Sequence, residues 1–256
     1  MRNVLAALTA AAVLVTVVPS AARAQGQSQG ITQQQADEML KELRAIRKAL
    51  ETLTQPQQPP GPPADKHGRL SDVRGYVLGK PDAPLTMVEF TDLQCPYCNR
   101  FTTTSFDQLK TQYIDTGKVR YISRDFPLDF HPQAMPAARA ARCAGEQGKF
   151  WELRLALLRG AAQLSPAFIS ATAASFKLEM KAFDACLASG KFDADIKRDI
   201  DAARSVGVEG TPSFLLGRTA PDGLDGVLVV GALPFEMFDA KLKELLAALP
   251  GAKPAK

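Results

Sequence analysis

The sequence is poor in histidine, cysteine and net charge, and each shortage argues against a class of function. Two histidines, His67 and His131, and four cysteines leave few ligands for a metal site. No glycine-rich motif of the kind that cradles phosphate is present. We therefore expect no metal, nucleotide or organic cofactor. The formal net charge is only +4, which does not favour nucleic acid as a partner.

Long apolar runs are also scarce. The sequence has one, near the start of the chain. Arg2 precedes an uncharged apolar stretch at 4–18, which is followed by Pro19 and the small-residue pattern Ala22-Arg23-Ala24. This order is typical of a secretory signal peptide over residues 1–24, cleaved after Ala24. A retained membrane anchor is the alternative, although a spanning helix needs roughly 20 apolar residues. We expect a periplasmic or otherwise extracytoplasmic protein whose net charge falls to +2 after cleavage.

The cysteines Cys95 and Cys98 form a CxxC motif directly after the apolar stretch 85–90. Two cysteines at this spacing can close a small disulfide, and a helix N-terminus favours the thiolate of the first. The alternative is half of a zinc site, which would need two more ligands at short spacing. The sequence therefore favours a redox pair that exchanges disulfides.

The other two cysteines, Cys143 and Cys186, stand alone in the sequence. Outside the cytosol disulfides persist, so a second bridge between them is one expectation. Each could instead be a free, buried cysteine that packs as a small hydrophobic residue.

A helix is expected over residues 31–54, ahead of a proline-rich linker at 55–68. The apolar positions of the helix alternate in steps of four and three residues, which indicates a short coiled-coil seam of Met39, Leu43, Ile46, Leu50 and Leu53. This seam predicts either self-association into a homo-oligomer or docking on the chain's own domain. The prolines of the linker favour an extended, semi-rigid spacer.

The remaining residues, 70–250, suffice for one α/β domain with a substantial core. Patterns of alternating or continuous apolar residues predict strands at 77–78, 85–90, 119–126, 213–216 and 227–230. Helices are expected at 98–113, in a helical block between about 130 and 206, and at 234–249. The first part of this order is a βαβ unit with a right-handed crossover.

This order resembles a thioredoxin fold with an inserted helical subdomain. The chain is most similar to the DsbA-like thiol–disulfide oxidoreductases and their DsbG-like and BdbD-like relatives. The resemblance rests on four motifs: Val88-Glu89-Phe90-Thr91-Asp92-Leu93-Gln94-Cys95-Pro96-Tyr97-Cys98, Phe130-His131-Pro132, Ala144-Gly145-Glu146-Gln147-Gly148-Lys149-Phe150-Trp151 and Gly207-Val208-Glu209-Gly210-Thr211-Pro212-Ser213-Phe214.

The resemblance implies a role for each site residue. Cys95 would be the exposed nucleophile and Cys98 the more buried resolving thiol. Thr211-Pro212 matches the cis-proline element, which lies against the CxxC motif and pairs with client backbone. Glu89 falls where the family places a buried acid that relays a proton, whereas the plainer interpretation is a solvated strand residue.

Asp92, His131 and the second cysteine pair complete the set of candidate residues. Asp92 is a weaker site candidate, because a residue at this place can simply cap the turn or the helix. His131 could lie near the site, but His-Pro before a helix is more often a turn and cap. Several relatives carry a second, structural bridge like Cys143–Cys186. The implied partners are exported client proteins and a membrane redox protein that resets the cysteines.

The direction of exchange stays open at this point. The dipeptide Pro96-Tyr97 replaces the Pro-His that is typical of strongly oxidising members. A dithiol oxidase is favoured, an oligomeric disulfide isomerase or reductase is the main alternative, and a non-enzymatic holdase or binding module is a third hypothesis.

Overall fold

A computed structural model describes residues 31–54 and 66–249 of the chain. The expected signal peptide at 1–24 and the part of the expected linker at 55–65 lie outside the described residues. The chain divides between Gly61 and Pro62 into two units, which are described separately.

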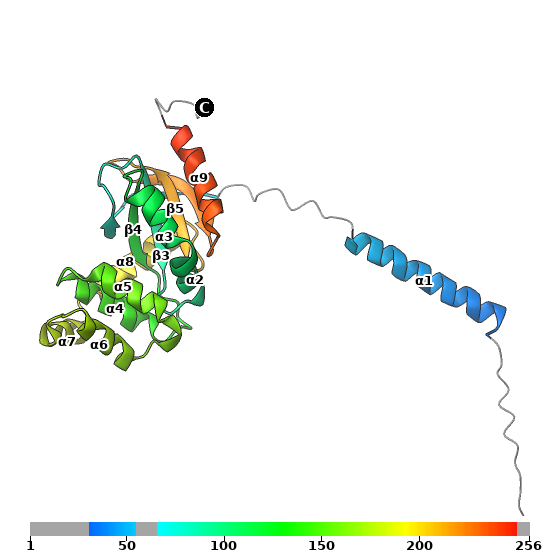
Figure 1. Ribbon diagram of the computed structural model, residues 1–256, viewed down its shortest axis with the longest axis horizontal. Coiled ribbons are helices and arrows are strands. Elements are labelled where there is room, and N and C mark those ends of the chain that lie inside the picture. Colours follow the sequence, from blue (N-terminus) through cyan, green and yellow to red (C-terminus); the bar gives the residue numbers. More distant parts are fainter. Residues whose placement is uncertain (1–30, 55–65, 250–256) are drawn as a thin grey trace, which may run out of the picture. The chain divides into compact units, whose positions relative to one another are not determined.

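The first unit contains helix α1 (Gln33–Thr54), drawn in blue in Figure 1. Thr32 precedes the helix, and its hydroxyl accepts a hydrogen bond from the backbone N–H of Gln35 at 3.3 Å. The side chain of Gln35 accepts one in return from the N–H of Thr32 at 3.0 Å, so a reciprocal cap begins the helix. The seam residues Met39, Leu43 and Ile46 are 49%, 59% and 54% exposed.

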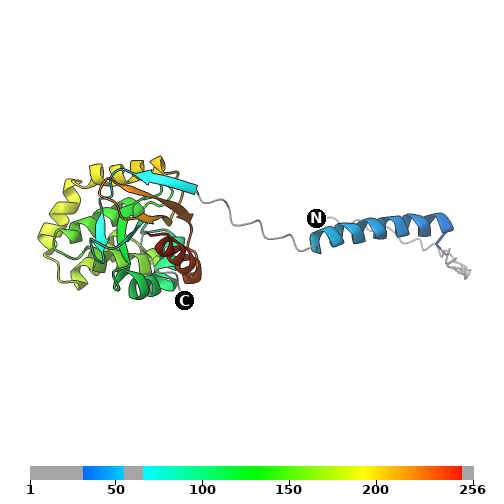
Figure 2. The same cartoon turned by 90° about the horizontal axis from the view of Figure 1, so that it is seen from above.

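The second unit is built on a six-stranded sheet in the order β1-β6-β5-β3-β4-β2. Neighbouring β3 and β4 are parallel, and every other pair is antiparallel. The strands are β1 (Lys66–Leu70), β2 (Tyr76–Leu78), β3 (Leu85–Thr91), β4 (Val119–Asp125), β5 (Ser213–Arg218) and β6 (Leu224–Val230). Figure 2 shows β1, in cyan, beside the orange β6 at the edge of the sheet.

Helices cover both faces of this sheet and extend beyond one end of it (Figure 1). They are α2 (Pro96–Thr104), α3 (Phe106–Leu109), the π-helical η1 (Lys110–Ile114), α4 (Ala134–Gly145), α5 (Phe150–Arg159), the 3-10 turn η2 (Ala161–Gln163), α6 (Pro166–Ser175), α7 (Met180–Ser189), α8 (Asp193–Ser205) and α9 (Phe235–Ala247).

Alternation along the central strands sends side chains to two separate cores. On β3, Met87 packs with residues of α2, α3 and α9, such as Phe101 and Phe238. Its neighbour Val88 points to the opposite face and packs with Ala203 of α8. All seven residues of β3 are buried, so the segment that leads into the CxxC motif is held rigidly between two layers.

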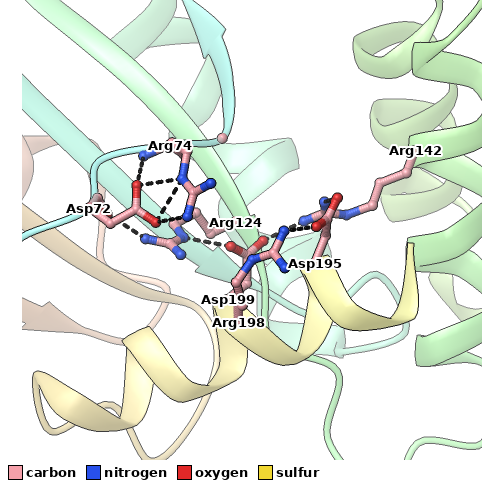
Figure 3. A pocket seen from close by; sticks show the side chains of 8 residues that line it. Asp72, Arg74, Arg124, Arg142, Asp195, Arg198 and Asp199 are labelled. Atoms are coloured by element: carbon pink, nitrogen blue, oxygen red, sulfur yellow. Dashed lines mark hydrogen bonds and ion pairs between the residues drawn. The ribbon is translucent and has the colours of Figure 1, made fainter. Parts of the chain in front are cut away.

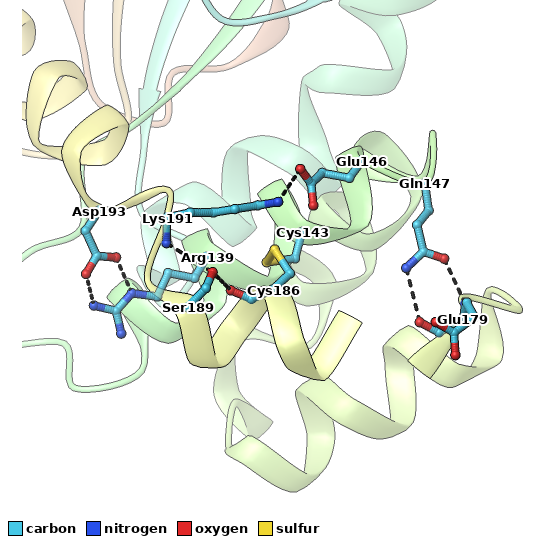
Figure 4. The surroundings of a disulfide bond; sticks show 9 residues. All are labelled: Arg139, Cys143, Glu146, Gln147, Glu179, Cys186, Ser189, Lys191 and Asp193. Carbon is cyan, nitrogen blue, oxygen red and sulfur yellow. Dashed lines mark hydrogen bonds and ion pairs between the residues drawn. A yellow bond between two sulfur atoms is a disulfide. The ribbon is translucent and has the colours of Figure 1, made fainter. Parts of the chain in front are cut away.

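The helical block α4–α7 has its own core, and a disulfide crosses it. Cys143 of α4 and Cys186 of α7 are joined, with their Cα atoms 5.8 Å apart. Figure 4 shows polar contacts around this bridge, including Arg139 Nε donating to Asp193 Oδ1 at 2.6 Å. The bridge therefore closes the helical block by linking helices that are 43 residues apart in the sequence.

A buried ion-pair network ties the helical block to the sheet (Figure 3). Arg124 of β4 donates to Asp199 of α8 at 2.7 Å, and Arg142 of α4 donates to Asp125 of β4 at 2.6 Å. Arg142 also pairs with Asp199. Burial raises the pKa of Asp125 to about 6 although Arg142 opposes this shift. These ion pairs therefore connect β4 of the sheet to both α4 and α8.

The structure differs from the sequence expectations at two places. Residues 98–113 were expected to form one helix, but α2 ends at Thr104 and is followed by α3 and the π-helical η1. The linker was expected to extend to residue 68, whereas β1 begins at Lys66. Most of β1 is polar and exposed, so backbone pairing with β6, rather than an apolar pattern, makes it a strand.

Candidate active site

Cys95 occupies the N-cap position of α2, with φ −69° and ψ 125°, and Pro96 begins the helix. Proline suits this first position because its missing N–H would have no partner there. The next backbone N–H groups, those of Tyr97 and Cys98, are the ones that an N-cap side chain reaches. A thiolate at Cys95 therefore meets free amide donors and the positive end of the helix dipole.

The two cysteines are in the dithiol form and both are buried. Only 3% of Cys95 is exposed, and Cys98 is fully covered. The expectation of an exposed Cys95 was therefore wrong. The reason is packing, because both cysteines belong to the core that Leu93 and the helical block build over the start of α2.

The surroundings of Cys95 lower its pKa from the usual 9.0 to about 6. The largest cause is the hydrogen bond from the Cys98 thiol, and the Thr211 side chain and the N–H groups of Cys98 and Tyr97 add to it against the effect of burial. Burial raises the pKa of Cys98 well above its usual value, and its contact with Cys95 adds to this. One thiol is thus activated while its neighbour stays protonated.

Thr211 and Pro212 lie against this pair. Their peptide bond is cis, and the Cys95 thiol donates to the backbone oxygen of Thr211 at 3.4 Å. The hydroxyl of Thr211 is buried and has no hydrogen-bond partner within the described part of the chain. The structure thus brings together Cys95, Cys98, Thr211 and Pro212, all of which the resemblance singled out.

Asp92 holds the loop between β3 and α2. Its backbone N–H donates to Cys98 Sγ at 3.5 Å, and its backbone oxygen accepts from the N–H of Cys95 at 3.1 Å. Its carboxylate accepts from the N–H of Gln94 at 2.7 Å and from that of Leu128 at 2.9 Å. Asp92 is therefore a turn residue, and its backbone also contacts both cysteines.

His131 joins this arrangement through Asp92 rather than through a sulfur atom. Its Nδ1 lies 2.7 Å from Asp92 Oδ2. Its backbone N–H donates to the oxygen of Leu128 at 2.9 Å, and its own oxygen accepts from Ala134 at 3.0 Å. The backbone of His131 therefore forms a turn, as one interpretation expected. Its side chain contacts Asp92 and so stabilises the loop between β3 and α2.

Glu89 is fully buried on β3, so the solvated interpretation was wrong. Its Oε2 accepts from the Tyr121 hydroxyl and forms an ion pair with Arg154 of α5. Its Oε1 is buried and has no hydrogen-bond partner among the residues at 31–54 and 66–249. Arg154 Nε also donates to Ser123 Oγ at 2.8 Å.

A family model described as Thioredoxin matches residues 71–224. The chain belongs to the thioredoxin family.

Among solved structures, this thioredoxin-family protein is similar to α-DsbA1 of Wolbachia pipientis, with a TM-score of 0.60, 27% identity, and 72% of this chain and 92% of that one covered. The catalytic domain of ScsC from Proteus mirabilis gives a TM-score of 0.54 with 25% identity, over 69% and 91% of the two chains. BdbD of Bacillus subtilis, 22% identical with a TM-score of 0.60 over 70% and 97%, shares the fold. The expected thioredoxin fold of the DsbA type, with its inserted helices, is confirmed.

Curated relatives of the family include much longer proteins. The Na+/H+ antiporter NhaA 3 of Salinispora tropica is 39% identical over 144 residues, which are 56% of this chain but 22% of that protein. The NhaA 1 protein of Salinispora arenicola is 38% identical over an equally small share of its length. The chain thus spans about a fifth of the length of these relatives.

Arg154 and Tyr121, which contact Glu89 in this family member, were not predicted from the sequence. A sequence signal for Arg154 existed, because it lies four residues after Phe150 and four before Leu158, and both of these are buried. An arginine at this spacing falls on the apolar face of α5 and needs a buried partner. No comparable signal marks Tyr121, which alternation alone places in the core.

Proposed function

We propose that this thioredoxin-family protein is an exported dithiol oxidase that passes the Cys95–Cys98 disulfide to client proteins. The observation that supports it best is the lowered pKa of Cys95, set against the raised pKa of Cys98. A stabilised Cys95 thiolate favours the reduced form, so the disulfide form readily gives up its bond. The resemblance to thiol–disulfide exchange proteins points to the same chemistry.

The exchange proceeds in two balanced steps. A client thiolate attacks Cys95 Sγ, the Cys95–Cys98 bond breaks, and Cys98 leaves with the electron pair and takes up a proton. A second client thiolate then attacks the client sulfur of the mixed disulfide and releases Cys95 as a thiolate. The client gains one disulfide and the protein gains two electrons, which a membrane redox partner removes.

Two exposed aromatic side chains belong to segments that are linked to the cysteines, one through the CxxC motif itself and one through His131 and Asp92. Tyr97, inside the CxxC motif, is 60% exposed, and Phe130 is 74% exposed. The Phe130 ring packs edge-on against His131, with centroids 4.5 Å apart, and His131 in turn holds the cysteine loop through Asp92. Apolar rings beside the site fit an unfolded client chain, whose apolar residues are still accessible.

The test is oxidation of a reduced, disulfide-dependent secreted protein by the disulfide form of this chain. We expect thiols to disappear from the client in a stoichiometric burst, and Cys95→Ser to abolish this burst. The matched control is the double variant Cys143→Ala/Cys186→Ala, which removes the other cysteines and should keep the burst. Client protection by Cys95→Ser equal to that of the parent chain would instead support a holdase.

An oligomeric disulfide isomerase is a second candidate, because the seam of α1 presents apolar side chains to solvent. The seam residues Met39, Leu43 and Ile46 are each about half exposed, and such a seam is what a partner helix covers in a coiled coil. A second copy of the chain would place several CxxC sites on one misfolded client.

Light scattering and reactivation of a scrambled-disulfide client separate the two candidates. If the protein is an oligomeric isomerase, it should be an oligomer by light scattering and should reactivate the scrambled client. Both properties should be lost in the paired variant Leu43→Glu/Ile46→Glu. The matched control, Lys41→Glu on the same helix, should change neither. A monomer that oxidises reduced clients but does not reactivate scrambled ones would exclude the isomerase and support the oxidase.

Export is proposed from the N-terminal sequence pattern. No helix in the described residues is long and apolar enough to cross a membrane. N-terminal sequencing of the protein recovered from the periplasm should begin at Gln25. Recovery of the uncleaved chain in the cytosolic fraction would contradict export and leave the exchange chemistry untouched.

A further inference from the structure

Polar side chains on either side of the CxxC motif connect it to the helical block. Gln94 directly precedes Cys95, and Asn99 directly follows Cys98. Both side chains are half-buried, and each forms a hydrogen bond with the backbone at one end of a helix in the block. Neither side chain takes part in the chemistry of exchange, so their placement beside the two cysteines needs another explanation.

Gln94 contacts the start of α4. Its Oε1 accepts a hydrogen bond from the backbone N–H of Gln133, the N-cap residue of α4, at 2.6 Å. The N–H groups at the start of a helix have no partner inside the helix, so Gln94 satisfies one of them from outside. The backbone N–H of Gln94 donates to Asp92 Oδ1 at 2.7 Å. The segment that leads into Cys95 is therefore attached to α4.

Asn99 contacts the end of α5. Its Nδ2 donates to the backbone oxygens of Leu158 at 2.7 Å and Arg159 at 3.3 Å. These oxygens belong to the last turn of α5, where a helix cannot satisfy its own carbonyl groups. The backbone N–H of Asn99 donates to the oxygen of Cys95 at 3.0 Å, so the two residues lie one turn apart on α2. The end of α5 is therefore held one helical turn from Cys95.

The two helices that are attached in this way also cover Cys95. Only 3% of this residue is exposed, and it shares a buried core with Ala137 of α4 and Leu157 of α5. A client sulfur must come into contact with Cys95 Sγ for exchange to occur. The covering helices therefore have to move aside before a client residue can enter.

We propose that Gln94 and Asn99 are positioning residues that hold α4 and α5 over Cys95 and so limit the rate at which a client sulfur reaches it. The inference rests on the proposed exchange at Cys95. The closed arrangement shields a reactive thiolate from small oxidants, which attack accessible thiolates first. Each contact contributes little net free energy, so a client that binds at the site can displace it.

Alkylation of the dithiol form with iodoacetamide measures access to Cys95. The thiolate attacks the methylene carbon and iodide leaves, so the rate reaches a plateau where Cys95 is fully ionised. Gln94→Met and Asn99→Leu keep the size of the side chain and remove the polar contact. We expect each to raise the plateau rate about fivefold, the change in a closed–open equilibrium when a hydrogen bond is lost. The double variant should raise it about 25-fold, because the contacts involve separate helices.

Two readouts separate access from activation and from unfolding. The closed form stays the major one, so the midpoint of the pH profile should remain at about 6 in every variant while the plateau rises. Cys98 should stay unmodified in peptide maps, because only unfolding exposes both cysteines. The matched control is Thr103→Val, which removes a hydroxyl that donates to the backbone oxygens of Asn99 and Arg100 within α2 itself. It should keep the plateau rate of the parent chain.

The two single variants test separate contacts, so if one of them does not fold the other still decides. The proposal is overturned if a folded single variant keeps the plateau rate of the parent chain. It is equally overturned if Cys98 is alkylated together with Cys95, or if the midpoint moves and the plateau does not. Failure of the proposed function has a different signature. In that case the variants would show the expected alkylation rates, but the disulfide form of the parent chain would not oxidise a reduced client.

Discussion

The thiol of Cys95 donates a hydrogen bond to the backbone oxygen of Thr211 at 3.4 Å. The hydroxyl of this threonine is buried and unpartnered among the described residues in the dithiol form, yet it contributes to the lowered pKa of Cys95. The Thr211 hydroxyl, in the loop with the cis Thr211–Pro212 bond, is therefore available to donate a hydrogen bond to the Cys95 thiolate.

Removing that hydroxyl should weaken the activation of Cys95. Thr211→Val keeps the shape of the side chain, so we expect the pKa of Cys95 to rise by about one unit, because a hydrogen bond to a charged group is lost. The ultraviolet absorbance of the thiolate, titrated against pH, measures this change. Thr211→Ser is the control and should retain the parent value. Equal titration curves for the valine and serine variants would contradict this role.

Alkylation of the parent chain should reveal two very different thiols. We expect the reaction of Cys95 with iodoacetamide to increase with a midpoint at about pH 6, the pKa of its thiol. Cys98 should stay unmodified there, because its pKa is raised and its side chain is fully buried. Peptide mapping after a short pulse distinguishes the two. A midpoint near 9.0, the usual value for cysteine, would refute the expectation.

The stability of the dithiol form should depend on pH in a definite direction. Folding lowers the pKa of Cys95 from 9.0 to about 6, so its stabilising contribution is complete above pH 9.0 and is lost as pH falls through 6. At pH 7 it amounts to about 1.4 kcal/mol. The disulfide form lacks this thiol.

Urea unfolding of both redox forms at about pH 5 and pH 7 measures this effect. The free energy of unfolding of the dithiol form should gain about 1.4 kcal/mol relative to the disulfide form between these values. Cys98 contributes nothing to the difference, because its raised pKa keeps it protonated in this range. Parallel changes in the two forms would exclude Cys95 as the source.

The second disulfide should matter for stability and not for exchange. Cys143 and Cys186 are 43 residues apart, and a loop of this length corresponds to about 4 kcal/mol in the chain-entropy treatment. The variant Cys143→Ala/Cys186→Ala should therefore lose stability of that order in urea. Its rate of client oxidation, measured well below its melting temperature, should equal that of the parent chain.

Much of the site could be predicted because its parts are local in the sequence. The CxxC spacing and Pro96 place Cys95 at a helix start, whatever the rest of the chain does. The apolar run of β3 before them indicates a buried strand. These features depend on residues that are close together in the sequence and on the backbone preferences of those residues, so the sequence is enough to predict them.

Other features could not be predicted, because they arise where distant segments meet. The burial of Cys95 depends on the helical block that packs over α2. The strand β1 exists because β6, more than 150 residues later, pairs with its backbone.

The amino-acid sequence by itself therefore determined the redox pair, the order of the thioredoxin-fold elements and the presence of a helical insertion, since periodicity and short motifs encode them. Tertiary structure alone decided which charges surround the cysteines. Arg154 reaches Glu89 across 65 positions of the chain. Only folding brings the two side chains together out of water, where an unpaired charge is too costly to persist.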